Sequence, residues 1–368
     1  MAKARWAFQW FLGLLVGATV AGSVQAQETE VLEPVAEESP TVFSDEGGLP
    51  CDFDAAPPRW ETWGSLLYLR PGSGNLEYAT LVSPLPLPTP NWANQALSPN
   101  LTPAFTIGAR YAVPATGHDI RATWTHLDAS ANASVTADVN QFVGPAFEIG
   151  PDASAFQVAQ GNVNFKYDSV TFDAGQLLAS QGRTQVRVFV GLEYARIVQT
   201  LEAHFRSEDG LIDNGNTNNS QFNGVGPRLG MRASTLHGNF DLLGEIAGSV
   251  LAGPLQSRLD FSARSPELGN LGIDPPNVQS ITSPNVTQVV PALDAKLGGG
   301  YTFFWHGCFR AEAGYRAAVY VNAISRYSIT EVNTPPVDQS VGVFLRTADH
   351  LQTNFTVHGP YASLTWAY

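Results

Sequence analysis

The chain of 368 residues lacks a long apolar segment. A membrane-spanning helix needs about 20 mostly apolar residues, and no run of about 18 occurs anywhere in the sequence. The stretch from Phe8 to Ala21 is too short and too rich in Gly and Ala to serve as one. Because Lys3 and Arg5 precede it and small residues around Ala26 follow it, this stretch predicts a secretory signal peptide over residues 1–26. We therefore expect an exported protein without a membrane helix.

Charge is also scarce, at 14% of residues against a usual share of about 25%. The acidic excess behind the net charge of −13 is concentrated near the start of the chain, where residues 27–58 contain nine acids and no base. This acidic, Pro-containing stretch has little to bury and predicts a disordered segment. The acidic balance disfavours a nucleic-acid partner.

Motifs for metal binding or catalysis are missing. The seven histidines form no His-x-His or His-Glu-x-x-His pattern, and the sequence has no Cys-x-x-Cys motif and no Gly-x-Ser-x-Gly elbow. We expect no metal, no cofactor and no enzymatic activity. The alternative is a scattered catalytic arrangement, and His204 with Glu202 and Asp209 is the best place for one.

Only two cysteines occur, Cys51 and Cys308. An even pair in an exported protein favours a disulfide between them. Two buried or unpaired thiols are the alternative.

The end of the chain alternates with a period of two residues. Ala362, Leu364, Trp366 and Tyr368 fall on one face of the final segment, and Ser363 falls on the other. This period is typical of a β-strand, and the terminal aromatics suit a membrane strand that meets the lipid headgroups. We interpret Leu364, Trp366 and Tyr368 as a C-terminal assembly signal and expect the barrel-assembly machinery as a partner.

Similar segments recur along the chain, which contains 34 glycines. Their connections alternate between long stretches and tight Gly-containing turns, as in outer-membrane barrels. The pattern predicts an all-β fold, an antiparallel transmembrane β-barrel of about ten strands (range 8–14) that occupies residues 59–368. The expected strands are 60–71, 103–114, 118–129, 161–176, 184–206, 221–235, 239–262, 286–304, 308–326 and 352–368. The run from Asp213 to Asn219 is interpreted as a polar turn in the connection 207–220.

Three stretches carry a family resemblance: WGSLLYLRP (Trp63–Pro71), GVGPRLGMRA (Gly224–Ala233) and the aromatic C-terminus. They resemble the pore-forming outer-membrane proteins typified by the Legionella major outer-membrane protein. The resemblance implies a porin-like barrel in the outer membrane of a Gram-negative cell, in contact with outer-membrane lipid and small solutes or ions. Residues 27–58 would then lie in the periplasm. The resemblance supplies no catalytic residue, and the sequence does not define an oligomeric state.

Charged residues on the strands fall opposite the apolar face. They cannot face lipid, because Arg at the bilayer midplane costs about 2–4 kcal/mol in a barrel. One reading is that they line a pore and set its ion preference; with six bases and four acids, the set hints at mild anion preference. The other reading is that they pair and fill the interior. The predicted pore-lining residues are Arg187, Glu193, Arg228, Arg232, Glu245, Asp294, Lys296, Arg310, Glu312 and Arg316.

Inward glycines distinguish the two readings. If positions such as Gly108, Gly230, Gly298 and Gly314 leave free space, the barrel is a channel for passive diffusion of ions or small polar solutes. If larger side chains fill the space, the barrel is a closed structural or adhesive protein that acts through its long extracellular loops.

Overall fold

The computed structural model describes residues 59–83, 91–114, 116–146, 156–181, 184–264, 277–305, 307–333 and 344–367. The expected signal peptide, the acidic segment, Cys51 and Tyr368 lie outside these residues. No helix within the described ranges is long and apolar enough to cross a membrane.

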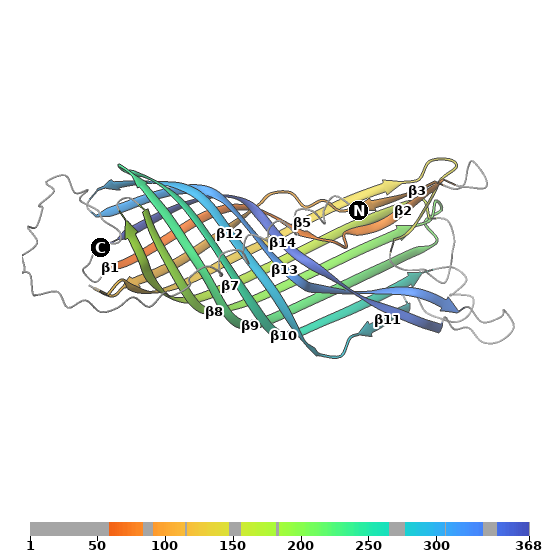
Figure 1. Ribbon diagram of the computed structural model, residues 1–368. Coiled ribbons are helices and arrows are strands. Elements are labelled where there is room, and N and C mark those ends of the chain that lie inside the picture. Colours follow the sequence, from red (N-terminus) through yellow and green to blue (C-terminus); the bar gives the residue numbers. More distant parts are fainter. Residues whose placement is uncertain are drawn as a thin grey trace, which may run out of the picture. The chain divides into compact units, whose positions relative to one another are not determined.

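Ten antiparallel strands form a closed ring, which confirms the predicted fold (Figure 1). Each strand pairs with the next, and the last pairs with the first through contacts such as Thr62 with Trp366. Closure leaves no free strand edge at the membrane, where an unpaired backbone is costly. The strands, in ring order, are β1 (Arg59–Ser73), β4 (Thr102–Ala112), β5 (His118–Thr136), β7 (Val158–Gln181), β8 (Thr184–Arg206), β9 (Asp213–His237), β10 (Phe240–Arg264), β12 (Val286–Phe304), β13 (Cys308–Asn333) and β14 (Phe344–Ala367).

The two ends of the barrel differ in their connections. At one end, which we call the turn end, the connections are short, and Gly117 and Gly238 adopt φ angles of 68° and 66°. Glycine suits these positions because a Cβ disfavours positive φ. At the other end, the loop end, longer connections hold four further strands: β2 (Glu77–Ser83), β3 (Asn91–Ala96), β6 (Phe142–Pro145) and β11 (Asn277–Thr282).

The sequence interpretation of Asp213–Asn219 as a polar turn is wrong. These residues form the first part of β9 and pair with both β8 and β10, for example Thr217 with Glu202 and with Asp260. The expected connection 207–220 therefore shrinks to residues 207–212. These polar residues adopt a β-strand conformation because β8 and β10 both extend far enough to form backbone hydrogen bonds with them.

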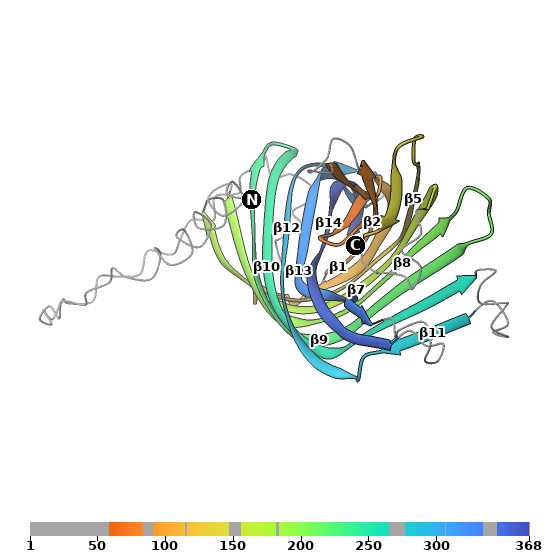
Figure 2. The same ribbon diagram turned by 90° about the vertical axis from the view of Figure 1, so that its right-hand side faces the viewer.

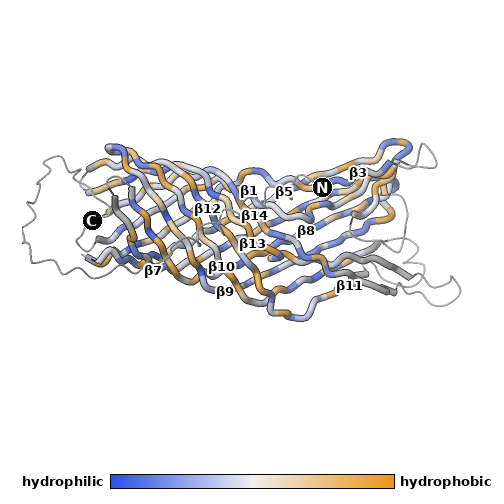
Figure 3. Tube along the Cα trace, viewed as in Figure 1, coloured by the Kyte–Doolittle hydropathy of each residue, from blue (hydrophilic) through white to orange (hydrophobic). Residues whose placement is uncertain are grey.

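Hydropathy alternates along many of the wall strands (Figure 3), and burial alternates with it, as in β8. On the outer face of β8, the residues Val186, Val190, Leu192 and Tyr194 form an apolar series that ends at Arg196. Only about 9–11 residues are needed to cross a bilayer, whereas β8 has 23. The strands therefore continue beyond the apolar band at the loop end.

Aromatic residues border this apolar band on both sides. Near the turn end, the exposed rings include Trp60, Phe240, Tyr301, Trp305 and Trp366. Near the loop end, the border includes Tyr68, Trp124, Tyr194 and Tyr315. Two such girdles are the arrangement that places a barrel in a membrane.

The strands β2, β3 and β6 form a separate small sheet in the mouth of the barrel (Figure 2). Both Tyr78 and Ala79 of β2 are buried, whereas most wall strands expose every second residue. The ring of Tyr78 lies against Gly161 of β7, where a Cβ would clash with it. The small sheet thus packs on the inner face of the wall.

Candidate functional site: the charged lumen

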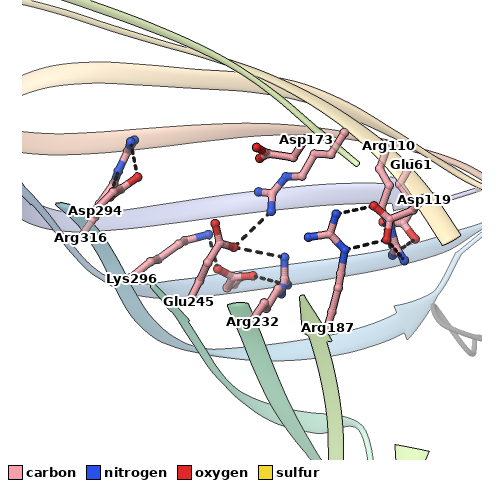
Figure 4. Close-up of polar contacts among 12 residues, drawn as sticks. Glu61, Arg110, Asp119, Asp173, Arg187, Arg232, Glu245, Asp294, Lys296 and Arg316 are labelled. Carbon is pink, nitrogen blue, oxygen red and sulfur yellow. Dashed lines mark hydrogen bonds and ion pairs between the residues drawn. The ribbon is translucent and has the colours of Figure 1, made fainter. Parts of the chain in front are cut away.

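All ten charged residues predicted to face inward lie in the barrel interior, on strands β8, β9, β10, β12 and β13. Figure 4 labels Arg187, Arg232, Glu245, Asp294, Lys296 and Arg316 among them. Their alternation with lipid-facing residues puts them there. None of the ten is isolated, because each makes an ion pair, a charged hydrogen bond or both.

Nearest the turn end, Arg187 of β8 reaches over Gly175 of the intervening strand β7 to Asp119 of β5. The Arg187 Nε atom donates to Asp119 Oδ2 at 2.6 Å. Arg110 joins the same group by donating to Asp119 at 3.2 Å and to Glu61 at 3.1 Å. Both carboxylates are almost fully buried, so the two arginines supply their compensating charge.

A second group gathers around Glu312 of β13. Its carboxylate lies 2.6 Å from Lys296 Nζ, 3.7 Å from Arg310 and 3.9 Å from Arg232. Arg310 also pairs with Asp241 of β10. Three cations thus surround one carboxylate, while a second carboxylate balances Arg310.

The third group lies deepest and centres on Arg228, whose side chain is only 5% exposed. Its guanidinium is 3.1 Å from Glu193, 3.5 Å from Asp294 and 3.7 Å from Asp173. Asp294 also accepts two hydrogen bonds from Arg316, at 3.1 and 3.0 Å. One buried arginine therefore links carboxylates from three different strands.

Six further charged residues belong to these groups but are not among the ten predicted pore-lining residues. Including them, the described interior network contains eight bases and eight acids, so its charge count does not support the expected mild anion preference. Alternation is the sequence signal that places such residues inside, as for Asp173 between Phe172 and Ala174 and for Asp241 between Phe240 and Leu242. The six are Glu61, Arg110, Asp119, Arg121, Asp173 and Asp241.

Little space remains between the groups. Two cavities of about 70 and 50 Å³ follow one another along the lumen, and both are lined by Trp63, Arg121 and Lys296. Arg121 separates them, since it donates to Glu245 at 3.1 Å and lies over the Trp63 ring at 4.7 Å. Each cavity is large enough for a few water molecules and too small for a larger solute.

The inward glycines do not leave free lumen. A Cβ at Gly108 would collide with the Trp63 ring, one at Gly230 with Phe189, and those at Gly298 and Gly314 with the Tyr361 hydroxyl. Large side chains from neighbouring strands therefore occupy the space that the glycines vacate. Of the two sequence readings, the filled interior is the one that describes this conformation.

An aromatic layer closes the lumen on the loop side of the charges. Tyr167, Tyr320 and Phe355 are fully buried, and their ring centroids lie 5.5 to 6.2 Å apart. The Tyr167 and Tyr320 hydroxyls hydrogen-bond at 2.8 Å, and Tyr320 donates to Glu193 at 2.7 Å. We call Tyr167, Tyr320 and Phe355 the aromatic layer; it joins the charged network to the apolar core above it.

The remaining sequence predictions lie at the two ends. Leu364 and Trp366 are outward-facing and exposed, as a lipid-facing C-terminal strand requires. His204 lies on the outer face of β8, and Glu202 accepts a hydrogen bond from Asn162 at 3.2 Å. The described residues contain no group of three or more His, Cys, Asp or Glu able to hold a metal ion.

Cys308 is the first residue of β13, at the turn end, whereas Cys51 lies outside the described residues. The disulfide between them therefore stays a prediction. Peptide mapping without reduction checks it: a peptide that links the two is expected, and recovery of both as free thiols would remove the prediction.

A closed antiparallel ring, an apolar outer band, two aromatic girdles and inward charges together define an outer-membrane β-barrel protein. The chain belongs to the family of the Legionella pneumophila major outer membrane protein precursor, whose sequence model matches residues 52–368. The protein is located in the outer membrane. Bacterial barrels have short periplasmic turns, so the turn end is periplasmic and the loop end extracellular.

Solved structures give weaker likenesses. The outer membrane protease OmpT from Escherichia coli is 11% identical, with a TM-score of 0.43 over 86% of this chain and 100% of that one. A Pseudomonas aeruginosa FadL homologue is 8% identical, with a TM-score of 0.24 over 84% and 90%. The Pseudomonas putida toluene transporter TodX is 8% identical, with a TM-score of 0.18 over 85% and 90%. No curated protein matches the chain. Likenesses at these TM-scores carry no conclusion about function.

Proposed function

We propose that the protein is a narrow outer-membrane channel for ions or small polar solutes, and that the conformation described here is its closed state. Passive diffusion, and not catalysis, is the proposed activity. The observation that carries the proposal is the polar lumen at membrane depth, where charged side chains and two small cavities follow one another along the axis.

Stability alone does not account for such an interior. Replacing a buried ion pair with apolar residues of similar volume is often neutral or stabilising. Ionisable groups at membrane depth commonly mark ion pathways. The alternation of cations and anions around Arg228, Glu312 and Asp119 offers successive sites to an ion of either sign. With eight bases and eight acids among the described lumen residues, we expect weak charge selectivity.

A second candidate is a closed barrel that acts through its extracellular part. The filled outer half supports it: Phe165, Ile197, Phe222 and Leu251 are all fully buried there, on the extracellular side of the charges. In this candidate the charged network only fills the barrel.

Flux from proteoliposomes separates the two candidates. The chain from Gln27 onward is refolded into vesicles that hold a potassium chloride gradient, and ion-sensitive dyes follow its decay. A channel gives decay above that of vesicles made with unfolded protein, with similar rates for the two ions. Decay equal to that of the control vesicles contradicts the channel and favours the closed barrel.

A further inference from the structure

The outer part of β13 leaves the barrel wall. Its pairing with β12 ends at Ala292 and Tyr320, and its register with β14 shifts between Tyr320 and Ile324. Within that shift, Asn322 adopts a φ of 57°, and its backbone N–H donates to Asn354 Oδ1 at 3.0 Å. A bulge of this kind bends a strand, so β13 has a defined bending point at Asn322.

Beyond the bend, β13 passes through the interior of the mouth. Ala323, Ile324, Ser325 and Arg326 are four consecutive residues that are 0%, 1%, 0% and 7% exposed. Most wall strands of this barrel instead turn every second residue to the outside. In Figure 2 the outer ends of β13 and β14 curve inward across the opening, and β13 contacts β9 and β10 there. We call residues 323–327, with their β14 partners 350–353, the arm.

Side chains, and not a backbone ladder, hold the arm against β9. The Ser325 backbone N–H donates to Ser220 Oγ at 2.9 Å, and Asn218 Nδ2 donates to the Tyr327 carbonyl at 3.3 Å. The wall strands, in contrast, exchange backbone hydrogen bonds along their whole paired length. The attachment of the arm to β9 is therefore weaker than the attachment of a wall strand to its neighbours.

The inner face of β9 beneath the arm is unusually polar. Asn214, Asn216, Asn218 and Ser220 are at most 4% exposed, and Asn216 Oδ1 has no hydrogen-bond partner among the described residues. The same holds for the equally buried Gln199 Oε1 and Ser257 Oγ on the flanking strands. Buried polar atoms without partners destabilise a fold. Apolar residues at these positions would stabilise a mouth that never opens. Polar residues suit a mouth that opens, because water hydrogen-bonds to them once the arm has moved away.

The bend also connects the arm to the aromatic layer. Tyr320 is the last wall residue of β13 before the bend, and its β14 partner is Phe355. Two of the three aromatic-layer residues therefore lie at the base of the arm. Movement of the arm would therefore displace two of the side chains that lie between the charged lumen and the mouth.

From these observations we propose that the arm is a gate, hinged at Asn322, that opens the extracellular side of the lumen by releasing the polar stripe of β9. The inference rests on the proposed channel function.

The test pairs two double variants of β9. N218A/S220A removes both β9 side chains that hydrogen-bond the arm, whereas N219A/Q221A changes outward-facing neighbours on the same strand. Loss of one hydrogen bond raises an opening equilibrium roughly fivefold. Hydrogen exchange of the arm amides is therefore expected to be about 25-fold faster in N218A/S220A than in N219A/Q221A, with exchange in β8 unchanged. Channel open probability, recorded in planar bilayers, is expected to rise with it.

Equal arm exchange in the two variants overturns the gate. Faster exchange without more current, in a chain that conducts, also overturns it, because the arm then moves without gating. No current from the native chain or from either variant contradicts the channel itself, while the exchange data still report whether the arm is hinged. If N218A/S220A does not fold, N354A replaces it, since it removes the exposed side chain that accepts the hydrogen bond from the Asn322 backbone N–H at the bend. Faster arm exchange is expected there too, and unchanged exchange counts against the hinge.

Discussion

Substitution of Arg228 by alanine tests whether the lumen is filled as described. Its guanidinium is close to three carboxylates, which keep different numbers of partners when it is removed. Glu193 keeps hydrogen bonds from Ser249 and Tyr320. Asp173 has no other ion pair among the described residues. Removing one partner from a buried ion pair costs about 3–5 kcal/mol, so we expect a loss of that size in the free energy of unfolding.

The assay is urea unfolding in lipid vesicles, followed by tryptophan fluorescence and extrapolated linearly. R196A is the matched control, because Arg196 is exposed on the outer face of β8. It is expected to change stability by at most about 0.5 kcal/mol. R228A/D173N is expected to recover part of the loss, since it removes the carboxylate charge left unpaired. A loss below about 1 kcal/mol in R228A would refute the packed interior and indicate that water surrounds residue 228.

Three further predictions test other parts of the barrel. G161V is expected to displace the Tyr78 ring and destabilise the protein by about 1–3 kcal/mol in urea unfolding, whereas G144V, with open space at its Cβ, is expected to be nearly neutral; equal effects would contradict the packing of the small sheet. Burial lowers the pKa of His350 below its ordinary 6.5, so its contribution to arm stability is full above about pH 6.5 and is lost as the pH falls through the lower folded value. Exchange at the Ser325 amide, corrected for its intrinsic rate, is then expected to accelerate from pH 7 to pH 5, and a flat profile would exclude this role. On a detergent gel, unboiled protein is expected to migrate differently from boiled protein, because a closed barrel resists unfolding; identical mobility would count against closure.

The barrel itself was largely predictable because two local signals repeat along the chain. Alternation assigns each residue to a face, and the high cost of charge in lipid decides which face is inside. These two signals were enough for the strand count and for the inward position of residues such as Arg228 and Glu312. They say nothing about which charges meet across the lumen. The hydrogen bond from Arg316 to Thr125, for example, joins residues 191 positions apart and depends on ring closure.

The inward path of residues 323–326 and the strand conformation of Asp213–Asn219 were not predictable, because both depend on distant segments of the chain. Residues 323–326 fall within the expected wall strand 308–326, and only the bend at Asn322 carries them inside. The polar run Asp213–Asn219 resembled a turn because its asparagines favour turns locally. Tertiary pairing with β8 and β10 overrides that preference. In both cases the deciding interactions come from segments far away in the sequence.

Single-channel recording tests the central claim most directly. The chain from Gln27 onward is inserted into planar bilayers and recorded at both polarities in a salt gradient. A filled lumen behind a gate predicts long closed periods interrupted by small current steps, with a reversal potential near zero because the lumen charges balance. A large current that stays open would contradict the closed conformation, and silence at every voltage would contradict the channel.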